Sequence, residues 1–161
     1  MREIIIINLF VEMEGRNKVK LFIKLVLISL VAGSILAVFL KIIQLTLKKQ
    51  SYVLLFNMDY IPFLKNFDTV KGSGYLFYFV FCFVSVIGLF YVAKMVGLEY
   101  NLTVYVLVFT VGSGILYFLT ALTNKPPDVT SVGSWLFWTV GHVLFGIVVG
   151  MMIKHWTFQQ S

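Results

Sequence analysis

Four long apolar runs constrain this chain more than any other feature of its sequence. They cover residues 25–47, 74–96, 102–122 and 134–153, and a helix needs roughly 20 such residues to cross the hydrocarbon core of a bilayer. Runs of this length are too long for β-strands and too apolar on all sides for surface helices of a soluble domain. The sequence therefore predicts an all-α integral membrane protein, a four-transmembrane-helix bundle within residues 25–154.

The composition excludes an ordinary soluble protein. Of the 161 residues, 60% belong to the set AVILMFWYC and 12% are charged, whereas soluble domains are about 45–50% apolar and about 25% charged. A domain of this size cannot bury so much apolar surface, so we expect the lipid bilayer to be its main partner. The net charge of +6 suits contact with anionic headgroups, and without a basic face interleaved with aromatic residues we expect no nucleic acid partner.

The charges outside the runs predict an orientation. Residues 1–24 hold five basic residues and are expected to form a cytoplasmic segment, of which residues 4–11 suit an interfacial helix or strand. Because the next run has full spanning length, we expect an uncleaved signal anchor. With four crossings, seven basic residues lie on the side of the two termini and five on the other. The positive-inside rule then places both termini in the cytoplasm, in a multi-pass protein of the cytoplasmic (inner) membrane.

The connections between the runs differ in length and character. The first, residues 48–73, is rich in aromatic residues and is expected to lie on the outer headgroup layer or to cap the bundle. The second and third are short, so the second, third and fourth runs are expected to be antiparallel sequential neighbours.

Small residues recur within the runs at helical spacing. In lipid, close packing of small residues holds helices together, because the hydrophobic effect between helices is absent. This pattern favours packing within the chain, and association with a second copy or another membrane protein is the alternative. The candidate packing residues are Gly33, Ala37, Gly112, Gly114, Gly141, Gly146 and Gly150.

His142 lies near the middle of the fourth run, where an ionisable side chain is costly unless it faces the bundle interior or a wet cavity. Three interpretations stay open: a neutral residue bonded to a hydroxyl of a neighbouring helix, a carrier of protons or ions, and a ligand contact. The carrier interpretation rests on the ordinary histidine pKa of about 6.5. The hydroxyl candidates are Ser29, Ser34, Ser85, Thr110 and Ser113.

Lys41 is the second polar candidate within a run. It lies toward the end of the first run, so we expect its ammonium to snorkel to the outer interface. Pairing with Asp59, Asp68 or Asp128 is the alternative. No run contains Asp or Glu, which disfavours transport coupled to cations.

Motifs of enzymes are missing from the sequence. It holds no GxSxG elbow, no HExxH, no glycine-rich phosphate loop and no pair of carboxylates within the runs. Cys82 is the single cysteine, and His142 and His155 stand apart from any cluster of ligand residues. We therefore expect that the protein is not an enzyme and that it binds no metal and no cofactor. The alternative, an enzyme that acts on lipid, would need polar groups that come together from separate helices.

Residues 119–154 resemble the C-terminal part of the YagU-like bacterial inner-membrane proteins. The shared elements are an apolar helix, the Pro126-Pro127 turn, and a helix with Gly141-His142 and a basic end at Lys154. The first run is similar to that family's first span through Ala32, Gly33 and Lys41. YqhR-like proteins of Gram-positive bacteria share the same four-span plan. The resemblance implies a small polytopic protein of the cytoplasmic membrane and assigns no chemistry.

Two functions are consistent with these features. The first is a non-enzymatic accessory or assembly subunit, associated with itself or with another membrane protein. The second is a small channel or transporter in which His142 lines a path for protons, ions or solutes.

Overall fold

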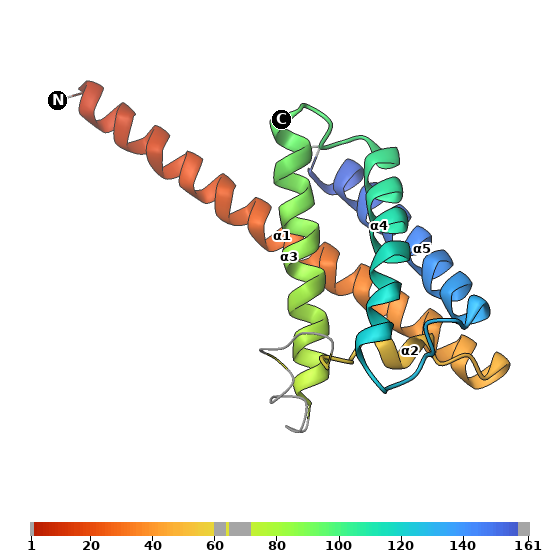
Figure 1. The fold of residues 1–161 in the computed structure, drawn as a ribbon. Coiled ribbons are helices and arrows are strands. Elements are labelled where there is room, and N and C mark those ends of the chain that lie inside the picture. The colour runs from red at the N-terminus through yellow and green to blue at the C-terminus, as the bar shows by residue number, and fades with distance from the viewer. Residues whose placement is uncertain (1, 60–63, 65–71, 158–161) are drawn as a thin grey trace.

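The computed structural model describes residues 2–59, 64 and 72–157, with side chains from residue 15 to residue 156 within those ranges. All elements in these ranges are helices (Figure 1). In chain order they are α1 (Arg2–Leu47), α2 (Ser51–Leu54), α3 (Ser73–Met95), α4 (Leu102–Leu116), the 3₁₀ helix η2 (Tyr117–Leu122) and α5 (Val132–Thr157).

The predicted four-span fold is confirmed. Among the described residues, the stretches long and apolar enough to cross a membrane are Gly15–Leu47, Ser73–Met95, Leu102–Leu122 and Val132–Trp156. Their outward surface is apolar: Val38 is 59% exposed, Val84 67% and Ile115 65%. Large apolar side chains turned outward along four such helices require lipid around them, so the chain is a multi-pass membrane protein.

Helix α1 is longer than the span predicted within it. It runs unbroken over 46 residues, which at a rise of about 1.5 Å per residue is roughly 69 Å, more than twice the thickness of a bilayer core. Residues 4–11 are therefore helical and continuous with the first span, and the strand alternative for them is wrong. The N-terminal part of α1 projects beyond the other helices (Figure 1), while its position at a membrane surface stays a prediction.

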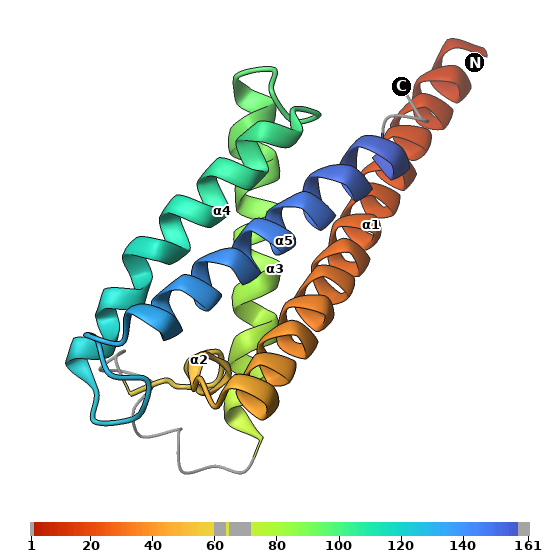
Figure 2. The same ribbon diagram turned by 90° about the vertical axis from the view of Figure 1, so that its right-hand side faces the viewer.

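The helices are packed as an open row. Helix α4 packs on α5, α5 on α1, and α1 on α3. The expected pairing of α4 with α5 is found, but the expected pairing of α3 with α4 is wrong, because these two helices diverge from the turn that joins them (Figure 2). Helix α3 turns its buried face to α1 instead, where the Tyr78 hydroxyl donates a hydrogen bond of 2.7 Å to the Gly33 carbonyl.

Most of the candidate packing glycines lie at contacts within the chain. A Cβ on Gly146 would lie 2.8 Å from Val106 Cα, so the backbones of α5 and α4 approach closely at this point. A Cβ on Gly141 would lie 2.9 Å from Leu36 Cδ1, and one on Gly150 2.6 Å from Leu102 Cδ1. Contacts also surround Gly33, Ala37 and Gly114.

Gly112 differs from this expectation. A Cβ at this position of α4 would have no described atom within 4 Å. The next glycine, Gly114, lies against Thr139 and Trp135 of α5, whereas Gly112 lines a cavity. Because glycine has no Cβ, this position adds to the space of the cavity and does not pack against a neighbouring helix.

The described part of the first connection caps one end of the bundle, as one of the two interpretations predicts. Leu54 and Leu55 are buried, and the Ser51 hydroxyl donates to the Ser134 carbonyl at 2.8 Å. The Asn57 side-chain amide donates to Thr123 Oγ1 at 3.3 Å. These bonds tie the connection to both sides of the Pro126-Pro127 turn. Residues 60–63 and 65–71, which include Asp68, lie outside the described residues.

Candidate functional site

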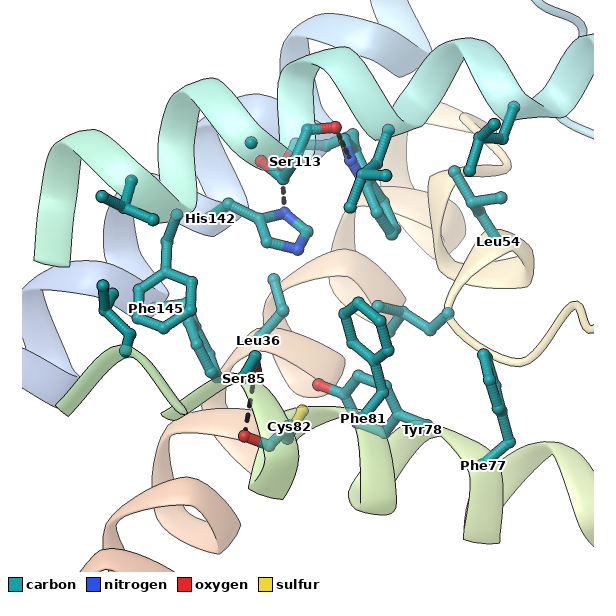
Figure 3. Close-up of a pocket in the computed structure, with 18 residues that line it drawn as sticks. Leu36, Leu54, Phe77, Tyr78, Phe81, Cys82, Ser85, Ser113, His142 and Phe145 are labelled. Carbon is teal, nitrogen blue, oxygen red and sulfur yellow. Dashed lines mark hydrogen bonds between the residues drawn. The ribbon is translucent and has the colours of Figure 1, made fainter. Parts of the chain in front are cut away.

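A cavity of about 390 Å³ lies between the diverging helices α3 and α4 (Figure 3). Helices α1 and α5 form its floor through Leu36 and His142, and the buried side chains of Leu54 and Leu55 line it at the capped end. Its volume is within the roughly 300–1,000 Å³ of small-molecule sites. The open row of helices thus leaves a space large enough for a small molecule inside the apolar part of the protein.

The cavity opens sideways, toward the lipid. Phe81 of α3 and Val108 and Leu116 of α4 line it, and these side chains are 50%, 47% and 44% exposed. All three lie in helices that cross the membrane. A molecule dissolved in the bilayer can therefore enter between α3 and α4 without passing through water.

His142 is the most polar group in the cavity wall. Its Nδ1 lies 2.8 Å from the carbonyl oxygen of Trp138, one turn earlier in α5. Because a carbonyl oxygen only accepts hydrogen bonds, the hydrogen of a neutral imidazole is assigned to Nδ1, which leaves Nε2 as an acceptor. Figure 3 shows this second nitrogen turned into the cavity. Within the described residues, the hydrogen bond of the imidazole is the one that Nδ1 makes.

Among the described residues, none of the hydroxyl groups predicted as partners of His142 bonds to its imidazole. Ser85 and Ser113 line the same cavity, but each donates to a carbonyl of its own helix, as does Ser29. Thr110 Oγ1 is buried with no partner in the described part of the chain. The histidine is therefore satisfied at one nitrogen by its own helix and stays available at the other.

Two tryptophans fix the position of His142. Trp138 Nε1 donates to the Ser113 carbonyl at 2.9 Å, and Trp135 Nε1 donates to the Gly114 carbonyl at 3.1 Å. Both carbonyls belong to the last turn of α4, directly before η2 begins, so the two indoles join α5 to this end of α4. The rings of Trp138 and His142 are 4.4 Å apart between centroids. The imidazole is thereby held against the floor of the cavity.

Aromatic residues of α3 form the wall that the sequence analysis missed. Phe77, Tyr78 and Phe81 line the side of the cavity opposite α4 (Figure 3). The dense aromatic sequence from residue 75 to residue 83 was the available signal. It does not show which of these rings face inward, because that depends on the angle at which α3 leaves the bundle.

Lys41 turns toward the capped end of the bundle. Its Nζ donates to Gln44 Oε1 at 3.1 Å and lies 4.7 Å from the centre of the Tyr52 ring. The alternative partner Asp59 pairs with Lys125 instead, at 3.2 Å. Asp128 accepts hydrogen bonds from Thr130, so neither of these described carboxylates pairs with Lys41.

Comparisons with protein-family models, with curated proteins and with solved structures find no match to this chain. The resemblance to YagU-like proteins thus stays a prediction from its motif residues.

Proposed function

We propose that this polytopic membrane protein is a non-enzymatic accessory protein that takes up a lipophilic molecule from the bilayer. The cavity between α3 and α4 is its binding site, and a hydroxyl group of the bound molecule donates to His142 Nε2. The observation that carries the proposal is the Nε2 acceptor of His142 in the wall of an apolar cavity that opens to lipid.

The size of the cavity selects the kind of occupant. A volume of about 390 Å³ suits a small molecule. A transmembrane helix is 10–12 Å across with its side chains and about 20 residues long, which is too large for this space. We therefore propose a small lipophilic alcohol, and not a helix of another protein, as the occupant of the cavity.

The polar atoms of the site indicate that the ligand carries a hydrogen-bond donor. Tyr78, Ser85 and Ser113 already donate their hydroxyl hydrogens to carbonyl groups. His142 Nε2 is a hydrogen-bond acceptor that a donor group of the ligand can reach. A hydroxyl group supplies that donor, and an ether of the same length does not.

The test compares bromoundecanol with its methyl ether on the purified protein in detergent. Bromine quenches tryptophan fluorescence, and Trp138 lines the cavity. The alcohol should bind about two- to twelvefold more tightly than the ether, as expected for one hydrogen bond worth about 0.5–1.5 kcal/mol. In His142→Leu this preference should vanish.

A pair of glycine variants tests the location. Gly112→Leu places a side chain in the cavity, where nothing lies within 4 Å of the added Cβ. Gly88→Leu makes the same change on α3, at an exposed position that also has open space and does not line the cavity. Binding should be lost in Gly112→Leu alone. Equal quenching in the two variants would contradict the proposal.

A channel or transporter is the second candidate, and His142 in a cavity wall is the observation that favours it. Such a path must connect both sides of the membrane, whereas this cavity lies between α3 and α4 and is lined by side chains that are exposed to lipid. Flux of protons, ions and small solutes into proteoliposomes tests it. Flux that is present in the wild type and lost in His142→Ala would favour this candidate.

A further inference from the structure

A second recess of about 290 Å³ lies at the capped end of the bundle, separate from the cavity between α3 and α4. Lys41 and Gln44 of α1, Tyr52 of α2, and Asn57 and Lys125 of the connections line it. Helix α1 ends nearby at Leu47. The recess is therefore at the end of a membrane span, where headgroups of lipid lie.

The ammonium of Lys41 has no anionic partner among the described residues of this recess. Its two contacts, Gln44 Oε1 and the Tyr52 ring, are both uncharged. No carboxylate among the described residues pairs with it. A lysine within a membrane span is costly and marks a functional site when it faces a polar space.

Lys125 brings a second cation from a distant part of the chain. It lies in the connection before α5 and pairs with Asp59 at 3.2 Å, and its own side chain is 40% exposed. Among the described residues, two ammonium groups and one carboxylate give the recess a net positive charge. The bonds of Ser51 and Asn57 hold these connections together, so the two cations are placed by the fold.

We propose that this recess binds a phosphate group between Lys41 and Lys125. Phosphate oxygens accept hydrogen bonds from ammonium groups, and the added negative charge balances the unpaired lysine. Two sources share this chemistry: the phosphodiester of an anionic lipid headgroup and free phosphate. The position at the end of a span gives the lipid direct access.

Native mass spectrometry of the full chain in detergent tests the site. The protein is titrated with short-chain phosphatidylglycerol, with phosphatidylcholine and with inorganic phosphate. Preference for phosphatidylglycerol over phosphatidylcholine assigns the lipid as the source, and binding of inorganic phosphate to the same residues assigns free phosphate. Absence of both overturns the proposal.

Charge variants locate the binding. Lys41→Gln and Lys125→Gln should each weaken it about fivefold, since one lysine near a headgroup contributes about 1 kcal/mol. Lys48→Gln is the matched control, because it removes an exposed charge at the same end of the bundle but outside the recess. If Lys48→Gln lost as much affinity as the two recess variants, the binding would reflect the overall charge of this end of the bundle, and the proposal would be wrong.

Two further variants separate binding from folding. Lys41→Arg keeps the charge, and a guanidinium also binds phosphate, so this variant should keep binding. Asp59→Asn removes the competing carboxylate and should tighten binding severalfold, which damage to the fold would not do. Weaker binding in Asp59→Asn, together with wild-type affinity in Lys41→Gln, would overturn the proposal.

Discussion

The imidazole of His142 donates from Nδ1 to the backbone carbonyl of Trp138, 2.8 Å away, while the indole of Trp138 donates to the carbonyl of Ser113 on the neighbouring helix. The tryptophan is thus one of the links between α5 and α4, and it also holds the imidazole of His142 in place. The contribution of His142 to stability should be small, and its contribution to ligand selection large.

His142→Leu should change the free energy of unfolding by less than about 1 kcal/mol. One hydrogen bond contributes about 0.5–1.5 kcal/mol net, and leucine recovers part of this by packing against apolar neighbours. The Trp138 carbonyl keeps its α-helical hydrogen bond in the variant. Unfolding in mixed micelles with increasing dodecyl sulfate measures the difference. A loss above about 3 kcal/mol would show that the imidazole is mainly structural.

Gly146→Ala should destabilise the protein by about 1–3 kcal/mol, as overpacking does in a tight core. The added Cβ would lie 2.8 Å from Val106 Cα and 2.9 Å from the Tyr105 carbonyl oxygen, and backbone atoms cannot move aside without separating α4 from α5. The same unfolding measurement serves here. Gly88→Ala is the control, since its Cβ meets open space and alanine favours a helix by up to about 1 kcal/mol over glycine. Equal stability of the two variants would contradict the packing.

The four spans could be predicted from the sequence because each is long enough to cross lipid on its own. The cavity could not, because it depends on how helices diverge. The short turn at Gly97, which has a positive φ of 70°, reverses the chain between α3 and α4, but a turn does not fix the crossing angle. Gly112 illustrates the limit: its spacing is that of a packing residue, and only the position of α3 shows that it faces empty space.

Asp128 should show a pH dependence confined to the turn before α5. Its pKa lies below the ordinary value, because its carboxylate accepts hydrogen bonds from the Thr130 hydroxyl and from the Thr130 backbone N–H. A lowered pKa in the folded state means that the charged form stabilises the turn above the ordinary aspartate pKa of about 3.9, and that this contribution is lost as the pH falls below it.

The comparison of the wild type with Thr130→Val tests this assignment. The variant lacks the hydroxyl donor, so the pKa of Asp128 should rise toward its ordinary value. Carboxyl resonances followed by NMR between pH 2 and pH 6, a range of about two units on either side of the ordinary pKa, measure the change. An unchanged pKa in Thr130→Val would assign the shift to another group.

The orientation of the chain gives the last prediction, since the charge difference behind it is small. Both termini are expected in the cytoplasm, which places the turn after α3 on the same side and the connection that holds Asn124 on the opposite side. Cys82 is the single cysteine and is buried, so a Cys82→Ala background leaves no reactive thiol. In that background, Asn124→Cys should react with an impermeant maleimide added to intact cells. Val96→Cys, at an exposed position of the other turn, should react only after the membrane is opened. The reverse pattern would invert the topology and place the recess of Lys41 and Lys125 at the cytoplasmic leaflet.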